Sequence, residues 1–202
     1  LEEKLADFIG VKHCISCSSG TDALLIPLMA YGVGPGDAVF TTPFTYIATA
    51  EVISLVGAIP VFIDIDPDTF NIDIEKLENQ IKQNPKRYKV VIPVSIFGLP
   101  ANFKELEDLK VKYNLKVVED AAQSFGSSIN KKMSCSFGDI GCTSFFPAKP
   151  LGCYGDGGAI FTNDDLIAED LKSIRVHGTG IDKYDNVRVG VNGRLDTLQA
   201  AI

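Results

Sequence analysis

The chain has 202 residues, of which 46% are hydrophobic and 22% are charged, the balance of an ordinary folded globular protein. Its 26 acidic and 19 basic residues give a formal net charge of -7, and no run of Lys or Arg is longer than a pair, so the sequence disfavours nucleic-acid binding. Pro27, Gly57 and Pro60 interrupt the longest apolar runs well before bilayer-spanning length, and we expect no membrane span.

Apolar, β-rich runs alternate with amphipathic helical patterns along the whole chain. Runs with strand character lie at His13–Ser18, Ala38–Thr42, Val61–Ile65, Val90–Ile96, Lys116–Glu119, Cys142–Phe145 and Ala159–Thr162. Helical patterns lie at Thr21–Tyr31, Tyr46–Val56, Ile74–Lys82, Phe103–Tyr113 and Asp164–Val176. Because strand–helix–strand crossovers produce parallel strands, the sequence predicts an α/β fold with a mostly parallel seven-stranded sheet and helices on both faces.

The two ends of the chain lie inside amphipathic stretches, Leu1–Ile9 and Leu195–Ile202, and the first residue is not methionine. We therefore expect a fragment of a longer protein. Residues 178–194 are rich in Gly, Asp and Asn, and this stretch is long for a connection without secondary structure, which predicts a functional loop.

The cysteines are too few and odd in number for a disulfide framework, and no secretion signal is visible, so we expect a cytoplasmic protein. They are Cys14, Cys17, Cys135, Cys142 and Cys153. Cys14 and Cys17 form a CxxC pattern within a strand-like segment, which favours buried, inert thiols over a redox or zinc site. His13 and His177 each lack a partner and are typical of surface or loop histidines rather than metal ligands.

The first candidate motif is Ser18–Asp22, where a predicted strand ends and a helix begins. Small residues there let the backbone approach an anion, and the free N–H groups of the first helical turn together with the Thr21 hydroxyl are donors to it. Ordinary helix capping explains the same residues, and taken alone it is the favoured interpretation.

The second motif is Glu119–Ser124, at the carboxyl end of an apolar run. Ligands of open α/β sheets collect outside the carboxyl ends of the strands, so Asp120 is expected to face the crevice. A carboxylate there can stabilise a protonated ring nitrogen and keep a pyridine cofactor electron-poor, although a cap or an ion-pair partner is the simpler reading of this motif in isolation.

The third motif runs from Ser144 to Gly152 and places Lys149 between Pro147 and Pro150. The prolines restrict the backbone, and a lysine in such a fixed, partly desolvated position is suited to forming a Schiff base, because only its neutral amine attacks an aldehyde. The glycines at 155, 157 and 158 allow the chain to pass close to a cofactor; since they lead into a strand and not a helix, they differ from a Rossmann loop.

Five motifs in order resemble the sugar aminotransferase family of fold-type I pyridoxal-phosphate enzymes (the DegT/DnrJ/EryC1/StrS type). They are Ser19–Leu24, Thr42–Thr49, Glu119–Ser124, Ser144–Lys149 and Gly190–Asp196. The resemblance covers nearly the whole chain and implies that residues 1–202 form the cofactor-binding large domain. It also implies that an N-terminal segment and a smaller C-terminal domain lie outside this chain.

The resemblance assigns roles to individual residues. Lys149 is similar to the Schiff-base lysine and proton shuttle, and Asp120 to the partner of the pyridine nitrogen. The other matching positions are Gln123 near the ring's phenolic oxygen, Tyr46 stacked on the ring, Gly20, Thr21 and Ser144 at the phosphate, Asn192 in a loop that reaches a neighbouring subunit, and Arg194 for an acidic substrate group.

The resemblance implies a homodimer that uses pyridoxal 5'-phosphate to move an amino group from an amino acid, glutamate, to a keto group of a nucleotide-linked sugar. Within the family, the sequence is most similar to the branch that aminates the 3-keto position of UDP-linked N-acetyl sugar uronates for surface-polysaccharide synthesis. Lys149 disfavours the dehydratase-type members, in which His replaces this lysine. Two alternatives stay open: another fold-type I enzyme, and a truncated, non-catalytic cofactor- or nucleotide-binding module.

Overall fold

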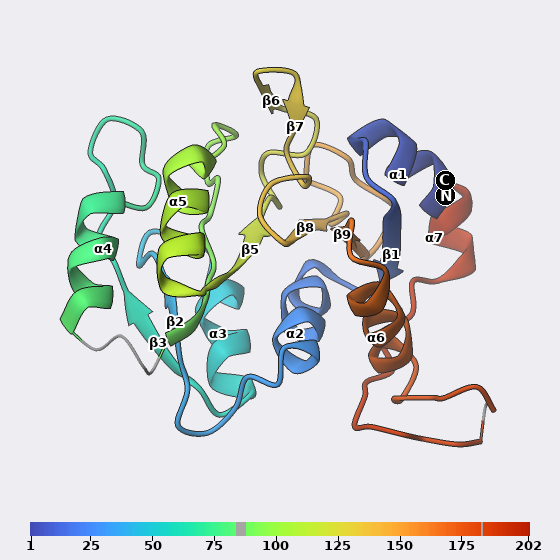
Figure 1. Cartoon of the computed structure of the whole chain (residues 1–202). Coiled ribbons are helices and arrows are strands. Elements are labelled where there is room, and N and C mark those ends of the chain that lie inside the picture. Colours follow the sequence, from blue (N-terminus) through green and yellow to red (C-terminus); the bar gives the residue numbers. More distant parts are fainter. Residues whose placement is uncertain (84–87, 183) are drawn as a thin grey trace.

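The computed structural model describes residues 1–83, 88–182 and 184–202 and contains a seven-stranded sheet with the order β1-β9-β8-β5-β4-β2-β3 (Figure 1). The strands are β1 His13–Cys17, β2 Ala38–Thr41, β3 Ile59–Phe62, β4 Tyr88–Val91, β5 Lys116–Asp120, β8 Ile140–Ser144 and β9 Gly158–Thr162. From β3 to β8 all neighbours are parallel, and β9 is antiparallel to both β8 and β1. The predicted fold class, an α/β fold with a mostly parallel sheet, is confirmed.

Helices cover both faces of this sheet (Figure 1). Their bounds are α1 Glu2–Ile9, α2 Gly20–Ala30, α3 Ala48–Leu55, α4 Ile74–Gln83, α5 Phe103–Tyr113, α6 Asp165–Arg175 and α7 Thr197–Ala201. On one face, α2, α3 and α6 pack against the sheet through residues such as Leu28, Ile53 and Leu171. On the other, α4 and α5 pack through Leu77 and Leu106, and α1 covers the end of the sheet near β1 and β9.

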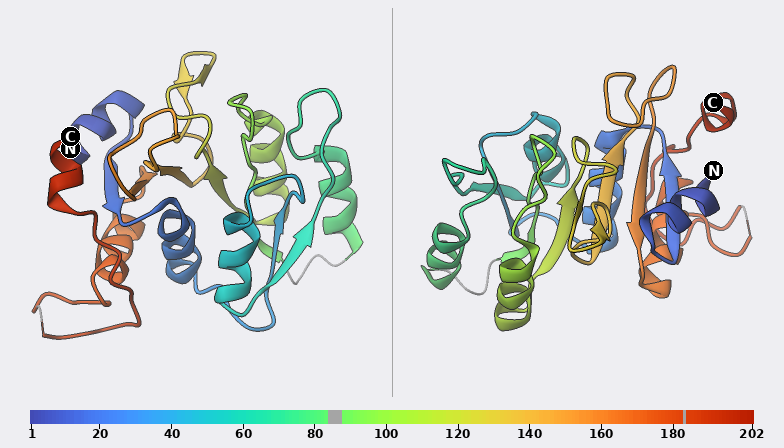
Figure 2. Two further views of the ribbon diagram at one scale, coloured as in Figure 1. Left: turned by 180° about the vertical axis from the view of Figure 1, so that it is seen from behind. Right: turned by 90° about the horizontal axis from the view of Figure 1, so that it is seen from above.

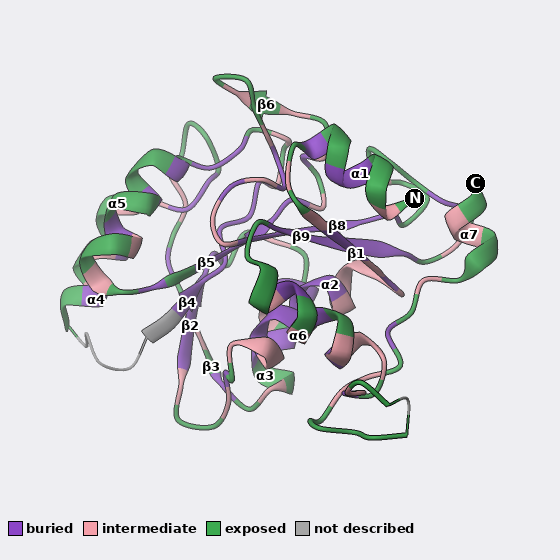
Figure 3. Ribbon diagram, turned by 45° about the vertical axis from the view of Figure 1, so that its right-hand side comes forward, coloured by how far each residue is buried: buried purple, intermediate pink, exposed green. Residues whose placement is uncertain are grey.

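Burial follows the sheet (Figure 3). The central strands β5, β8 and β9 are buried on both faces, because a strand inside a sheet that helices cover on each side has no solvent-facing side. The edge strand β3 is only half-buried, which explains how Pro60 can lie within it: an edge strand tolerates a residue without an N–H group. Within the described residues, no helix is long and apolar enough to cross a membrane.

Local sequence signals mark where several helices begin and end. Ser19, Asn102 and Asp164 cap α2, α5 and α6 by accepting hydrogen bonds from backbone N–H groups of the first turn. Asn114 ends α5 in the left-handed conformation, as residues after a helix often do.

The bounds of two strands and one short hairpin differ from the sequence prediction. β3 begins at Ile59 and ends at Phe62, two to three residues before the predicted Val61–Ile65, and β4 ends at Val91 although apolar residues continue to Ile96. A short hairpin, β6 Ser128–Ile129 and β7 Lys132–Met133, was not predicted. Its turn residues Asn130 and Lys131 both have positive φ angles, and Asn-Lys is a weaker turn signal than Asn-Gly.

The carboxyl ends of β1, β2, β4, β5 and β8 share one edge of the sheet, because these strands run in the same direction. The loops that follow them therefore meet there, although they are far apart in sequence. The two ends of the chain lie on one side of the molecule, near α1 and α7 (Figure 2).

Candidate functional site

A cavity of about 420 Å³ opens at the carboxyl edge of the sheet. Loops after β1, β2, β4, β5 and β8 all contribute to its wall. Seven of the residues singled out in the sequence line it: Gly20, Thr21, Tyr46, Asp120, Gln123, Ser144 and Lys149. Motifs that are spread between Gly20 and Lys149 in the sequence thus form one site, at the position where open α/β sheets bind ligands.

Asp120 is the last residue of β5 and lies on the floor of the cavity. Its Oδ2 accepts a hydrogen bond from the Thr49 hydroxyl at 2.8 Å, and its Oδ1 accepts one from the Ala122 N–H at 3.2 Å. Burial raises the pKa of Asp120 above its ordinary value, while these two hydrogen bonds and the positive charge of Lys149 oppose that rise. The site therefore holds a buried carboxylate with few compensating donors.

Lys149 lies in the loop after β8 and is half-buried in the same cavity. Its N–H donates to the Phe146 carbonyl at 2.8 Å, which closes a turn around Pro147. A Cβ at Gly152 would lie 2.7 Å from the Pro147 carbonyl oxygen, so the returning chain packs directly on this turn. These contacts fix the backbone of the loop, and Lys149 therefore stands at the wall of the cavity.

The start of α2 forms the opposite end of the cavity. Ser19 accepts a hydrogen bond from the Asp22 N–H at 3.1 Å as the helix cap, and Gly20 and Thr21 begin the first turn. Backbone N–H groups in a first turn lack partners within the helix and carry the positive end of its dipole. Ser144 lies against Gly20, where a Cβ would come within 2.6 Å of the Ser144 Cβ. Together these groups form a cup that suits a phosphate.

Tyr46 and Gln123 complete the set, and both are largely exposed at the cavity wall. Tyr46 is 69% exposed, so one ring face is accessible to a ligand. Because both side chains are exposed at the cavity wall, a molecule bound in the cavity can contact them.

Asn192 and Arg194 do not line this cavity. Asn192 forms an isolated antiparallel bridge with Val176, after the end of α6. Arg194 borders a separate, open pocket together with Glu2 and Arg175. The loop that precedes them leads away from the body of the chain (Figure 1).

Several cavity residues carried no role in the sequence analysis, notably Thr45, Thr49 and Asp156. Thr45 and Thr49 are four residues apart at the start of α3, and their hydroxyls lie 2.9 Å from each other. That spacing is visible in the sequence, but the contact of Thr49 with Asp120 joins residues separated by 71 positions and depends on the sheet order.

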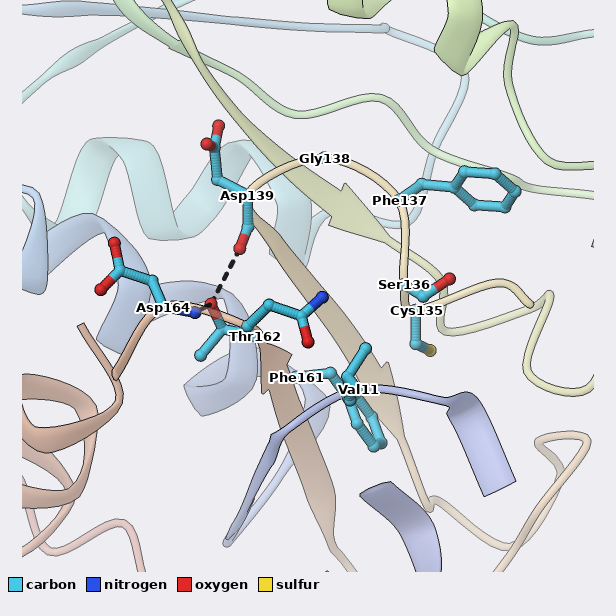
Figure 4. A pocket seen from close by; sticks show the side chains of 10 residues that line it. Val11, Cys135, Ser136, Phe137, Gly138, Asp139, Phe161, Thr162 and Asp164 are labelled. Carbon is cyan, nitrogen blue, oxygen red and sulfur yellow. Dashed lines mark hydrogen bonds between the residues drawn. The ribbon is translucent and has the colours of Figure 1, made fainter. Parts of the chain in front are cut away.

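A second pocket, of about 320 Å³, lies at the opposite edge of the sheet (Figure 4). One of its polar residues, Asp139, is already engaged: the Val117 N–H donates to its carboxylate at 2.8 Å and Lys110 pairs with it at 3.0 Å. The Thr162 hydroxyl donates to the Asp139 carbonyl at 3.0 Å. These contacts join the start of β8 to its neighbours, and the pocket is a structural junction.

Comparison with known proteins identifies the family. Residues 1–202 match the sequence profile of the DegT/DnrJ/EryC1/StrS aminotransferases. The chain belongs to this family. The UDP-2-acetamido-2-deoxy-3-oxo-D-glucuronate aminotransferase of Pseudomonas aeruginosa is 57% identical over 202 residues, which cover all of this chain and 55% of that protein.

Solved structures of the DegT/DnrJ/EryC1/StrS family have the same fold. A member from Brucella abortus superposes with a TM-score of 0.96 at 52% identity, covering 99% of this chain and 55% of that one. NtdA of Bacillus subtilis, solved with the bound cofactor PMP, gives a TM-score of 0.90 at 33% identity, covering 99% and 45%. The chain thus spans about half the length of these relatives. Aminotransferases of the family use pyridoxal 5'-phosphate.

Proposed function

We propose that the protein containing this chain is a pyridoxal-phosphate-dependent aminotransferase that acts on a nucleotide-linked keto-sugar, with residues 1–202 as its cofactor-binding large domain. The observation that carries the proposal is the convergence of Lys149, Asp120 and the start of α2 on one cavity. Membership in an aminotransferase family supports it.

The residues present fit the cofactor group by group. The cup formed by Gly20, Thr21 and Ser144 would hold its phosphate, and the Asp120 carboxylate would face its ring nitrogen. The amine of Lys149 would attach to its aldehyde carbon, and Gln123 would contact the phenolic oxygen. The cavity volume of about 420 Å³ is in the range of small-molecule sites.

The bound cofactor supplies an electron sink that stabilises negative charge on the carbon next to the transferred nitrogen. Asp120 would keep the ring nitrogen protonated, because an ionised carboxylate favours a neighbouring positive charge. Tyr46 would stack against one face of the ring. Lys149 would serve as the base that moves a proton between the two carbons that flank the transferred nitrogen.

The substrate proposal rests on relatives. The protein from Pseudomonas aeruginosa, at 57% identity, is named for a UDP-linked 3-oxo N-acetyl sugar uronate, and we propose the same class of substrate, with glutamate as the amino donor. Such a product serves surface-polysaccharide synthesis. Arg194 lies outside the cavity of its own chain, so it would pair with the acidic group of a sugar in the neighbouring subunit's site, since a guanidinium binds a carboxylate through two parallel hydrogen bonds.

The substrate assay uses the full-length protein loaded with pyridoxal phosphate. Glutamate alone should convert the cofactor to its amino form with release of one 2-oxoglutarate per site, and the UDP-linked 3-keto uronate should then restore the original absorbance. A 4-keto sugar nucleotide is the matched comparison. Faster restoration by the 4-keto sugar would contradict the substrate assignment, and no reaction with any amino donor would contradict the function.

We further propose a homodimer in which the loop 178–194 of one subunit completes the site of the other through Asn192. Exposed apolar residues support a partner surface: Tyr46 at the cavity is 69% exposed, and Ile181 and Val189 in the loop are fully or largely exposed. None of these side chains is covered by the chain itself.

Co-expression of two inactive variants tests the shared site. In a mixed dimer of Lys149→Ala and Asn192→Ala subunits, one site combines an intact Lys149 with an intact loop from the partner, and activity should reappear. If the loop serves its own subunit, both sites carry a defect and the mixed dimer stays inactive. Each variant alone is the control, and a monomer in light scattering would also contradict the proposal.

A further inference from the structure

Two threonine hydroxyls connect the mouth of the cavity to the buried carboxylate. The Thr45 and Thr49 Oγ1 atoms lie 2.9 Å apart, and the Thr49 Oγ1 lies 2.8 Å from Oδ2 of Asp120. Thr49 is 1% exposed and belongs to the first turn of α3, whereas Thr45 is half-buried in the preceding loop. All three residues line the cavity.

The direction of this chain of hydrogen bonds follows from the number of protons. A hydroxyl has one proton to donate, and an ionised carboxylate can only accept. Thr49 must therefore donate to Asp120, and the bond between the two threonines must run from Thr45 to Thr49. Both protons thus point toward the carboxylate, which is the arrangement that stabilises its negative charge.

We propose that Thr49 is a positioning residue, supported by Thr45, that holds the Asp120 carboxylate ionised and oriented for the ring nitrogen of the cofactor. This inference rests on the proposed cofactor site. Asp120 is 6% exposed and receives hydrogen bonds from Thr49 and from the Ala122 N–H, one on each oxygen. Without the Thr49 hydroxyl, Oδ2 of this buried carboxylate would lose the hydrogen bond that stabilises its negative charge, and protonation of Asp120 would become easier.

The other groups around Asp120 act differently. Lys149 is the cation that faces it from the loop after β8, and its charge lowers the pKa of Asp120. Glu119 points to the opposite face of β5, and the thiols of Cys142 and Cys135 stay protonated because burial raises their pKa values well above the ordinary range. Thr49 from α3 and Ser95 from the segment after β4 are uncharged neighbours of Asp120. A hydroxyl donor from α3 is thus a separate contribution from the charge of Lys149.

The test measures cofactor affinity against pH in the full-length protein, without turnover. An ionised Asp120 strengthens cofactor binding, so the affinity falls at low pH as this group is protonated. Thr49→Val keeps the shape of the side chain and removes the hydrogen-bond donor. In this variant the fall in affinity, here called the acid limb, should begin about one pH unit higher, so that the dissociation constant at acid pH rises about tenfold. Thr49→Ser should restore the wild-type limb, and Thr45→Val should shift it less in the same direction.

Matched controls separate positioning from packing. Thr41 is also fully buried, and its hydroxyl donates to the Ile92 carbonyl at 3.0 Å, so Thr41→Val removes a comparable bond without touching the site and should leave the limb unchanged. Asp120→Asn should show no acid limb, and this result would assign the limb to the titration of Asp120. If Thr49→Val does not fold, the smaller shift of the acid limb expected for Thr45→Val tests the inference instead.

An unchanged limb in Thr49→Val, an equal shift in Thr41→Val, or no recovery in Thr49→Ser would overturn the inference. A wild-type protein that does not bind pyridoxal phosphate would contradict the proposed function instead.

Discussion

Replacing Gly20 by alanine would place a Cβ atom 2.6 Å from the Ser144 Cβ and 3.0 Å from its Oγ. Carbon atoms in contact normally lie about 3.5–4.0 Å apart, so α2 and β8 would have to separate by about 1 Å. Overpacking of this kind costs about 1–3 kcal/mol. The backbone at Gly20 lies outside the left-handed region, so restricting the unfolded chain would by itself stabilise the variant by about 0.4–1 kcal/mol, and the clash decides the sign.

We therefore expect Gly20→Ala to lower the free energy of unfolding by about 1–2 kcal/mol and to weaken pyridoxal-phosphate binding by about tenfold or more, because the displaced atoms form the phosphate cup. Urea unfolding and fluorescence titration of the full-length protein measure the two effects. Gly34→Ala is the control: its Cβ would lie 3.8 Å from the nearest atom, the Val56 carbonyl oxygen, and stability should not fall.

The double variant Gly20→Ala with Ser144→Gly removes the atom that Gly20→Ala would meet. Stability should recover while cofactor affinity stays low, because the Ser144 hydroxyl is also gone. If Gly20→Ala binds the cofactor as tightly as the wild type, the phosphate cup does not lie between α2 and β8 and the geometric argument is wrong.

Three other predictions concern buried acids and thiols. Asp120→Asn should retain the cofactor and lose about 10²–10³-fold in kcat, as other preorganised electrostatic groups do, and near-wild-type turnover would contradict its role. Burial raises the pKa of Glu119 to about 7, so the folded state binds this proton more tightly than the unfolded one. Its contribution to stability is present below about pH 4.5 and is lost by up to about 3 kcal/mol as the pH rises to about 7. In urea unfolding at several pH values, Glu119→Gln should lack this loss, and an equal pH dependence in both proteins would rule the assignment out. Burial also raises the pKa values of four thiols, so their alkylation at pH 8 should be much slower in the native protein than in urea. Peptide mass spectrometry measures the two rates, and equal rates would show that these thiols are accessible. They are Cys14, Cys17, Cys135 and Cys142.

Much of the fold could be predicted because its core strands are short apolar runs between capped helices. β5, for example, lies where Lys116–Glu119 predicts it, since a strand buried on both faces has a continuous apolar pattern. The prediction was less accurate at the edge of the sheet. Pro60 predicts the end of a strand, because proline has no N–H group to donate. In the described sheet, however, β3 is an edge strand that pairs with β2 alone, and an edge strand can contain a proline.

The candidate site could be predicted as a set of motifs but not as a geometry. The local patterns alone favoured ordinary capping for Gly20 and Asp120, and only the resemblance to a family assigned roles to them and to Lys149; the parallel topology explains why the three residues meet. The Thr49 hydroxyl was not recognised as a partner of Asp120, because hydrogen bonds across 71 residues depend on which helix packs over which strand. The positions of Asn192 and Arg194 outside the cavity likewise follow from the path of the chain after α6.

Borohydride reduction of the cofactor-loaded, full-length protein, followed by peptide mass spectrometry, tests the central claim most directly. Reduction converts a reversible bond between the cofactor's aldehyde carbon and an amine into a stable one, so the cofactor should be recovered on the peptide that contains Lys149. Lys149→Ala should give no adduct, and Lys149→Arg should give none either, because a guanidinium stays protonated and cannot attack an aldehyde. Recovery of the adduct on another lysine, such as Lys172, would contradict the assignment of Lys149 and the mechanism built on it.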